Sequence, residues 1–464
     1  MNILGSIFSN PSKTTSDEKL KKEKETIAAR LGASIADLAA FEASYKNFET
    51  KSYKKEIVSK KKSDTTASDN IIDRIVDELL DNCLIIEYND GKITKKTLHA
   101  DTKPVSLEEI MALPEEIRPE LTGKYMKRDI DEPAYIELMN NLINFEETKN
   151  PGFYHRFRQG LDILDLDAIT YEMLSCNKNA MSYWLEKIAE SVNKDGFFKI
   201  PDTKIVKVPL TLLQLTRIDY ESLHKTTLEI IDRWAQKAFE LNDSKKYFLK
   251  TGTYSSKFDF RNAKVTDSKE IKEIGEYLLY IHYSALQMAQ FDIHRRRPVV
   301  YGVSTTNEWV VRDFIEDKEN NPCIYHGMPL RTEYRAFVDF DTKEVFGIHS
   351  YWDPNVMKDR FDNYSDNLSP DVLHDSVIYR THENELMNKF ESNKDIVLKH
   401  IKNIIDSNTE LTGQWSVDIM QNGDEFYFID MAVAEQSAFY KEEVPEEKRR
   451  LTAENWIPTI SAKS

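Results

Sequence analysis

The sequence predicts an α+β protein with an additional helical domain on its N-terminal side. Between residues 196 and 440, short apolar runs bounded by turn residues alternate with longer amphipathic stretches, which is typical of strands interspersed with helices. Before residue 196, apolar residues recur mostly at helical spacing. A chain of 464 residues exceeds one ordinary hydrophobic core, so we expect two or three domains.

Charge separates the first 64 residues from the rest of the chain. The whole chain has 63 Lys and Arg against 79 Asp and Glu, a formal net charge of −16. Residues 1–64 contain 13 basic and 9 acidic residues, a net charge of +4, so the remaining 400 residues carry −20. This acidic excess argues against a surface that coats nucleic acid, because phosphate binding requires a basic face.

The segment 1–64 is predicted to be an N-terminal helix and a basic linker. Residues 27–45 are amphipathic, and the lysine-rich residues 51–68 are typical of solvated coil, the alternative being an arm for an acidic partner. No apolar run reaches membrane-spanning length, and the first residues lack the basic start of a signal peptide. We therefore expect a cytoplasmic protein that makes no membrane contact.

Residues 65–195 are predicted to form a helical accessory domain. Three helix starts are indicated by Asp69, by Ser106 in a Ser-x-x-Glu capping box, and by Pro133. The first of these helices is expected to run as far as Ile86, and a last helix is expected over 180–192. The region shows no residue pattern of a catalytic site, and we consider it as a surface for a protein partner.

Residues 196–440 supply the strands and the remaining helices. Strands are predicted within 197–200, 204–208, 245–252, 263–267, 307–317, 332–352 and 414–433, and helices over 226–241, 272–291 and 395–408. The strands are expected to pair largely as antiparallel hairpins, with turns at Asp341-Thr342 and Asn422-Gly423. The last residues, 441–464, are predicted to be a charged tail that docks through Trp456 and Ile457.

Two aspartates on one predicted hairpin are the first candidates for chemistry. Asp418 and Asp430 lie on strands joined by the Asn422-Gly423 turn, so antiparallel pairing can bring both carboxylates to one end of the sheet. Two hard oxygen ligands on neighbouring strands suit a magnesium ion bound to nucleotide phosphates. In the alternative interpretation both side chains face water, but their large apolar neighbours favour a metal or a charged partner.

With this hairpin, VDIM followed by FYFIDMA, the chain resembles the ATP-grasp superfamily. The resemblance covers about residues 196–440 and implies two α+β lobes that grip ATP, with Asp418 and Asp430 as magnesium ligands. Ala432 departs from the pattern, because relatives have an asparagine there that helps to hold a second metal ion. Either Glu435 or Gln436 compensates for it, or the site works with a single ion.

The resemblance also assigns lysines to the phosphates. Lys250 on a strand and Lys257 after a loop of small residues match the family's phosphate-binding lysines. A lysine suits this task as a point charge, and small loop residues let backbone amides approach phosphate oxygens.

The strand WVVRDFIED resembles the family's adenine hinge. The resemblance implies that the carbonyl of Asp313 and the amide of Ile315 pair with the base, and that Glu316 or Asp317 reaches the ribose. Arg312 is a second departure, because many relatives have Glu at this position. The alternative interpretation is a core strand that ends in a charged turn.

The run that starts with Glu333-Tyr-Arg335 resembles the Glu-x-Arg strand of several ATP-grasp ligases. The resemblance places Glu333 at the nucleotide and Arg335 at the transferred phosphoryl group, where a planar guanidinium suits the developing charge. Arg331 is expected to share that role, and residues 350–352 to line an acceptor pocket. In the alternative interpretation the arginines form cross-strand ion pairs with Glu333 or Glu344.

The function implied by the resemblance is that of an ATP-dependent ligase. ATP and Mg²⁺ would convert a carboxylate, on a small molecule, peptide or protein, into an acylphosphate that an amine or another nucleophile attacks. The Glu-x-Arg strand and its aromatic-ended partner also resemble the cell division cycle protein 123 family. That resemblance implies the alternative, an ATP-binding assembly factor or regulator without ligase turnover. A structural pseudoenzyme is the third interpretation.

Overall fold

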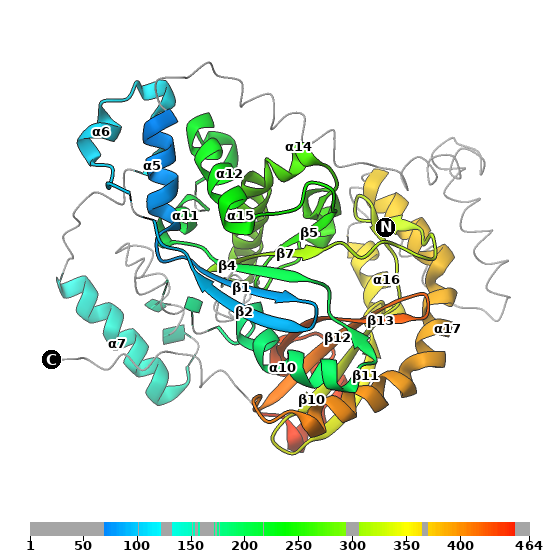
Figure 1. Cartoon of the computed structure of the whole chain (residues 1–464). Helices are drawn as coiled ribbons and strands as arrows, with labels where there is room; N and C mark the ends of the chain where they lie inside the picture. The colour runs from blue at the N-terminus through cyan, green and yellow to red at the C-terminus, as the bar shows by residue number, and fades with distance from the viewer. Residues whose placement is uncertain are drawn as a thin grey trace.

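The computed structural model describes residues 69–100, 102–121, 132–150, 177–216, 218–293, 306–363 and 370–450, with residues 152–153, 156–157, 171 and 174–175. The helix expected over 27–45, the basic linker, and Trp456 and Ile457 of the expected tail lie outside these ranges. Most of the described strands belong to two sheets that face each other across the centre of the molecule (Figure 1).

The first sheet has six strands in the order β2-β1-β4-β7-β5-β6, and all neighbouring pairs are antiparallel. Its strands are β1 (Leu84–Asn89), β2 (Lys92–Thr97), β4 (Thr203–Lys207), β5 (Tyr247–Thr251), β6 (Lys264–Val265) and β7 (Glu308–Asp313). Helices α5 (Asp69–Leu80), α12 (Lys225–Phe239) and α15 (Ile274–Ile293) share one hydrophobic core with this sheet. At its centre Trp234 of α12 meets Trp309 of β7 edge to face, with ring centroids 5.5 Å apart.

The β1–β2 hairpin corrects the sequence prediction for residues 81–86. The expected helix from Asp69 ends at Leu80, and residues 84–97 form two strands. Asp90 and Gly91 both have positive φ, +47° and +78°, which is the turn that an Asp-Gly pair favours between antiparallel strands. Because β1 pairs with β4, the segment 65–195 does not form a purely helical unit.

The second sheet has five strands in the order β11-β10-β12-β13-β3. Its strands are β3 (Phe198–Lys199), β10 (Glu333–Asp339), β11 (Glu344–Ser350), β12 (Gln414–Asn422) and β13 (Glu425–Val433). The β10–β11 and β12–β13 hairpins confirm the predicted turns, and the short β13–β3 pair is parallel. Helices α10 (Met181–Asp195) and α17 (Pro370–Ser407) pack on one face and share a core with it.

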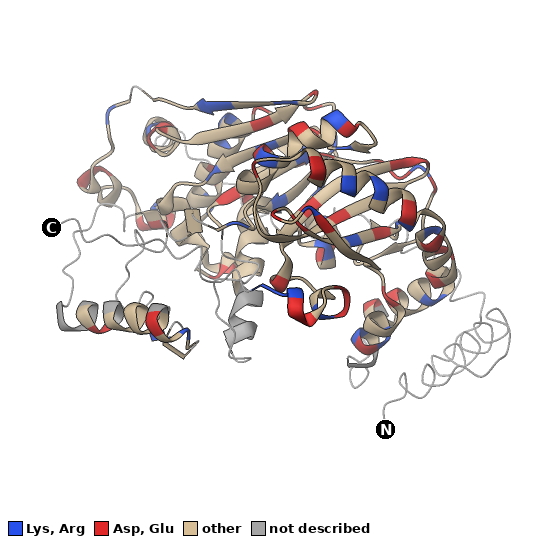
Figure 2. Cartoon of the chain, turned by 90° about the horizontal axis from the view of Figure 1, so that it is seen from below, with Lys and Arg blue, Asp and Glu red and all other residues tan. Residues whose placement is uncertain are grey.

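Shorter elements complete the described chain. They are α6 (Leu107–Met111), α7 (Glu132–Thr148), α11 (Leu210–Leu215), α13 (Phe260–Ala263), α14 (Ser268–Ile271), α16 (Pro354–Asn363), α18 (Tyr440–Glu443), β8 (Cys323–Ile324), β9 (Met328–Pro329) and single 3₁₀ turns, one of them at Lys257–Asp259. The predicted capping box of Ser106 and Glu109 starts α6. Figure 2 shows basic and acidic residues interspersed along the elements. None of the helices in the described ranges has the length and apolarity to cross a membrane.

Candidate functional site

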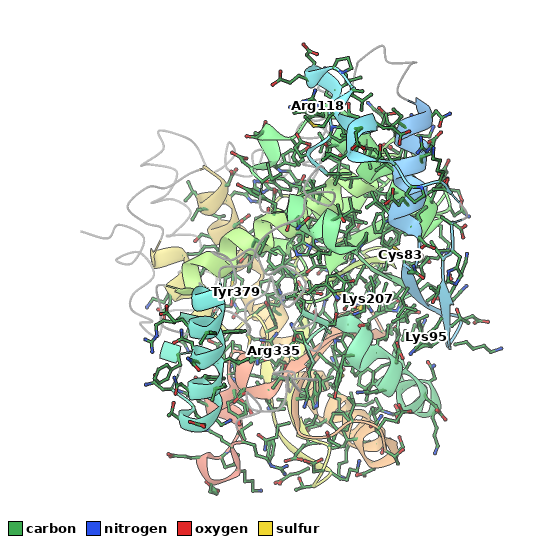
Figure 3. The ribbon with its side chains drawn as sticks, turned by 90° about the vertical axis from the view of Figure 1, so that its left-hand side faces the viewer. Cys83, Lys95, Arg118, Lys207, Arg335 and Tyr379 are labelled. Carbon is green, nitrogen blue, oxygen red and sulfur yellow. The ribbon has the colours of Figure 1, made fainter. Side chains whose placement is uncertain are left out.

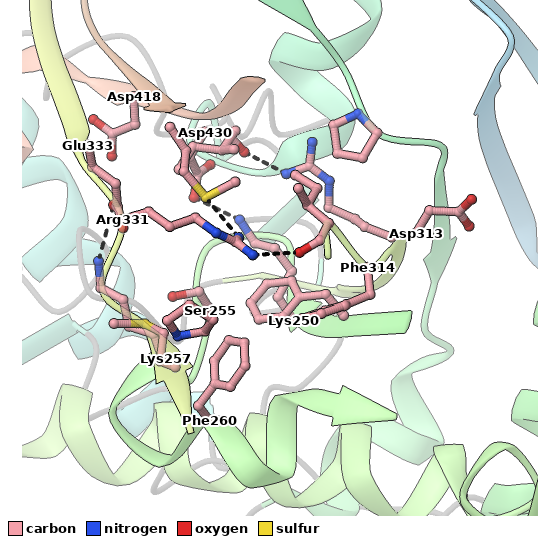
Figure 4. A pocket seen from close by; sticks show the side chains of 18 residues that line it. Lys250, Ser255, Lys257, Phe260, Asp313, Phe314, Arg331, Glu333, Asp418 and Asp430 are labelled. Carbon is pink, nitrogen blue, oxygen red and sulfur yellow. Dashed lines mark hydrogen bonds and ion pairs between the residues drawn. The ribbon is translucent and has the colours of Figure 1, made fainter. Parts of the chain in front are cut away.

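A pocket lies between the two sheets and collects residues from both (Figure 4). The space between its lining atoms, including open solvent at the mouth, is about 860 Å³. The lining residues that the sequence predicts as functional are Lys250, Lys257, Asp313, Ile315, Arg331, Glu333, Asp418 and Asp430. The remaining lining residues, mostly apolar, are Pro201, Phe248, Ser255, Phe260, Arg312, Phe314, Met328, Pro329, Met420 and Ile429.

Three charged side chains form a row across the five-stranded sheet. Arg335 of β10 lies opposite Asp418 of β12, which lies opposite Asp430 of β13. Arg335 makes a bidentate pair with Asp418, with Nε–Oδ1 at 2.8 Å and Nη2–Oδ2 at 2.6 Å. Burial opposes the charge of Arg335, but Asp418 outweighs it and raises the pKa of the guanidinium. The predicted cross-strand ion pair therefore exists, with Asp418 as the partner instead of Glu333 or Glu344.

Lys250 connects the two sheets through an ion pair with Asp430. Its Nζ, on β5 of the six-stranded sheet, lies 2.8 Å from Asp430 Oδ2 on β13. The lysine side chain is 2% exposed and the aspartate 31% exposed, so the pair stands at the inner wall of the pocket. Asp430 and Asp418 are both lining residues, and Figure 4 shows them on the same side, with Lys250 below.

Lys257 faces Glu333 and an aromatic ring. Its Nζ lies 4.0 Å from Glu333 Oε2 and 3.5 Å from the ring centroid of Tyr351. The Cζ of Arg335 lies 4.9 Å from the same centroid. Burial raises the pKa of Glu333, although Lys257 opposes the shift. Tyr351, which sequence analysis placed at an acceptor pocket, thus contacts both predicted phosphate-facing cations.

The predicted hinge forms one wall of the pocket through Asp313, Phe314 and Ile315. Asp313 pairs with Lys245 at 2.7 Å, and its carboxylate is directed away from the other labelled side chains in Figure 4. Glu316, expected at a ribose, is 60% exposed, pairs with Lys246, and is outside the lining of the pocket. Asp317, the alternative candidate for the ribose, is 16% exposed and contacts Arg331. A ribose contact by either residue stays a prediction.

Arg331 braces the hinge from inside. Its Nη2 donates to the carbonyl oxygen of Ile315 at 2.8 Å, and its Nε lies 3.4 Å from Asp317. These contacts hold the guanidinium of Arg331, a lining residue of the pocket, against the hinge and outside the row that contains Arg335. The role expected for it at a phosphoryl group stays a prediction. The predicted acceptor residue Trp352 is 2% exposed and donates to the carbonyl of Arg331 at 2.8 Å, which places it in the core.

Arg312 is a site residue that the sequence revealed only as a departure from a family pattern. It is 5% exposed, and burial lowers its pKa to about 10. Its Nε donates to Thr203 Oγ1 at 3.1 Å and its Nη1 to the carbonyl of Ile429 at 2.6 Å. Ile429 is the extra residue of a bulge, since Asp418 faces Asp430 whereas Ile419 faces Phe428. Arg312 therefore ties the two sheets together beside Asp430, through a bulge that the sequence pattern does not announce.

The carboxylates suit a magnesium ion that arrives with phosphates. Within the described ranges, no group of three or more His, Cys, Asp or Glu side chains is placed to hold a metal by itself. Mg²⁺ in phosphate sites uses one or two carboxylates with water and phosphate oxygens, which matches the Asp418–Asp430 pair. Glu435 and Gln436, the candidates to replace the missing asparagine, are not among the lining residues, and Gln436 bonds to Asn179.

No protein-family model and no curated protein matches the chain. Solved structures that are similar to it include Cdc123 from Schizosaccharomyces pombe and a C-terminally truncated Cdc123 from the same organism. Their sequence identities are 14% and 13% and their TM-scores 0.31 and 0.32. In both, the match covers 55% of this chain and 83% of the other chain. The interpretation of the pocket rests on its own geometry.

Proposed function

We propose that the pocket binds ATP with Mg²⁺, and that the protein is an ATP-binding assembly factor or regulator without ligase turnover. The observation that carries the proposal is the meeting of Lys250, Lys257, Asp418 and Asp430 in one pocket between two sheets. Lys250 pairs with Asp430, and Arg335, which is outside the lining, pairs with Asp418. The geometry provides cations for phosphates and carboxylates for a metal at the same place.

The apolar part of the pocket suits a base. Phe248 stacks on Phe260 with ring centroids 5.8 Å apart, and Phe260 lies 6.2 Å from Phe314, so three aromatic rings form a continuous wall. Met328 and Met420 add flexible apolar contacts to the lining. A ligand with a flat apolar part and a multiply charged part fits such a lining, and a nucleoside triphosphate is the common ligand of this kind.

The charged part suits phosphates through the chain's own side chains. Lys250 and Lys257 would act as point charges toward phosphate oxygens, while Arg335 keeps Asp418 oriented on its strand. Asp418 and Asp430 would hold Mg²⁺, which supplies charge neutralisation between phosphate groups.

Three observations favour an assembly factor or regulator over a ligase. Both carboxylate-facing nitrogens of Arg335 are engaged by Asp418, so the guanidinium is committed to a structural pair. Trp352, expected at an acceptor pocket, is packed in the core. Ala432 has no side-chain oxygen for a second metal. A ligase is the second candidate, favoured by the contacts of Tyr351 with both Lys257 and Arg335.

Release of ADP in the presence of pooled amino acids and peptides separates these two functions. We expect ATP to bind without product formation, so that ADP appears at the same low rate with and without the pool. ADP release that requires both an added carboxylate and Asp430, tested with Asp430→Asn, would identify a ligase. Absence of ATP binding to the wild type would overturn the proposal as a whole.

A further inference from the structure

A buried carboxylate lies behind the loop that carries Lys257. Glu308, the first residue of β7, has a fully buried side chain, 0% exposed. Its Oε2 accepts from Lys207 Nζ at 2.9 Å, and its Oε1 accepts from the backbone N–H of Ser182 at 3.1 Å, in the first turn of α10. A helix N-terminus stabilises a carboxylate, so Glu308 has two compensating positive partners. Lys207 also donates to Ser182 Oγ at 2.8 Å.

Gly252 lies between the Glu308 carboxylate and the start of α10. Its N–H donates to the carbonyl of Glu308 at 3.1 Å, and its carbonyl accepts from the N–H of Met181 at 3.1 Å. A Cβ on Gly252 would lie 2.3 Å from Glu308 Oε1 and 2.6 Å from Thr306 Oγ1. Only a residue without a side chain permits this approach. The Glu308 side chain packs against the backbone at Gly252 and accepts from Ser182 N–H, next to the Met181 N–H that holds the Gly252 carbonyl. Through the start of α10, the Glu308 side chain therefore supports the position of the loop backbone at Gly252.

The loop runs from Gly252 directly to the pocket. Thr251 accepts at its Oγ1 from the N–H of Tyr254 at 3.0 Å, and its own N–H donates to the carbonyl of Tyr254 at 2.9 Å, which closes a tight turn. Ser255 and Lys257, which follow, line the pocket. The position of the Lys257 ammonium thus depends on the anchor at Gly252, five residues earlier.

The contacts among Lys207, Glu308 and the start of α10 connect the two sheets. Lys207 and Glu308 lie opposite each other on β4 and β7 of the six-stranded sheet, whereas α10 packs on the five-stranded sheet that carries Asp418 and Asp430. Figure 3 shows Lys207 in the interior beside α10. The network therefore fixes where the loop stands relative to the carboxylate pair.

We propose that Glu308 is a positioning residue for phosphate binding, holding the Lys257 loop against α10. The inference rests on the proposed function of the pocket. Among the residues that the structure describes, those lining the pocket do not include Glu308, Lys207 or Gly252, so Glu308 acts through the loop and not on the ligand. Loss of its charge leaves Lys207 without its carboxylate and loosens the loop, and the base-binding wall is unaffected.

The ratio of ATP affinity to adenosine affinity tests this role, because adenosine lacks the phosphates that the loop serves. For Glu308→Gln, an isosteric change, we expect the Kd of Mg–ATP to rise about tenfold, the value of about one charge-assisted hydrogen bond. The Kd of adenosine should stay within about twofold. Calorimetric titration of the full chain measures both. The control is Asp339→Asn, because Asp339 is also a buried carboxylate in an ion pair, with Arg450, and is away from the loop.

Several outcomes separate the two proposals. If Glu308→Gln weakens ATP and adenosine equally, or neither, the positioning role is wrong while the nucleotide pocket stands. If the wild type binds neither ligand, the proposed function itself fails. Should Glu308→Gln not fold, Lys207→Gln tests the same network from a partly exposed residue, with a smaller loss of ATP affinity expected in the same direction. An unchanged ATP-to-adenosine ratio in that variant would overturn the inference as well.

Discussion

We predict that replacing Asp430 destabilises the protein more than replacing Lys250, its partner in the ion pair between the two sheets. Asp430→Asn leaves the Lys250 ammonium, 2% exposed, without its carboxylate. Removal of one partner from a buried pair costs about 3–5 kcal/mol, because a buried charge remains uncompensated. Lys250→Met leaves Asp430, which is 31% exposed and can be solvated, while methionine refills the volume. That cost is closer to the roughly 0–1 kcal/mol of an exposed pair.

Urea unfolding of the ligand-free protein measures this difference. We expect Asp430→Asn to lower the free energy of unfolding by about 2–5 kcal/mol more than Lys250→Met, at an unchanged m-value. Lys245→Met is the matched control, because Lys245 is 47% exposed and pairs with Asp313, and its cost should stay within about 0.5 kcal/mol. Equal costs for the two variants, or a larger cost for Lys250→Met, would refute the assignment of Lys250 as the buried member of the pair.

Three further predictions follow from the site and its surroundings. Mg²⁺ added without nucleotide should give no binding heat, because Arg335 and Lys250 already neutralise Asp418 and Asp430; a millimolar site in the absence of ATP would contradict this. His349→Gln should lower the free energy of unfolding at low pH, because Glu443, against the effect of burial, raises the pKa of His349 in the folded protein. The stability that His349 contributes is complete below its unfolded pKa of about 6.5 and disappears as the pH rises through the raised pKa. If His349→Gln were as destabilising at pH 9 as at low pH, the charge of His349 would not be the cause of the loss. Gly252→Ala should lower the free energy of unfolding by about 1–3 kcal/mol through overpacking against Glu308, and a neutral result in thermal unfolding would show that the loop can shift.

Local sequence signals were sufficient for the elements that hold the site. The apolar runs around Lys250, Arg312 and Asp418 are strands as predicted, and the Asn422-Gly423 turn predicts the hairpin that carries both aspartates. The register next to this turn would pair Asp418 with Ile429, and only the bulge at Ile429 places Asp418 opposite Asp430. The Asp90-Gly91 pair carried the same kind of signal, but the apolar residues before it also fit helical spacing. Pairing with β4, a contact distant in sequence, decides for the strand.

The partners of charged side chains were less accessible to sequence reasoning. Whether Arg335 faces a ligand or Asp418, and whether Arg331 faces the pocket or the carbonyl of Ile315, depends on strand register and on the path of the hinge. Glu308 looks in the sequence like the solvated first residue of a strand, and its burial follows only from the packing of α10 against Gly252. Such residues are found through tertiary contacts, because their sequence neighbours carry no sign of them.

Mg²⁺-dependent ATP binding, measured by calorimetric titration of the wild type, Asp430→Asn and Asp424→Asn, tests the central claim most directly. Asp424 is exposed and lies on the same hairpin, so it controls for the change of an aspartate in this place. We expect the wild type and Asp424→Asn to bind Mg–ATP alike, and Asp430→Asn to bind at least about tenfold more weakly. ATP binding that is absent from the wild type, or equal in all three proteins, would contradict a nucleotide site at the Lys250–Asp430 pair.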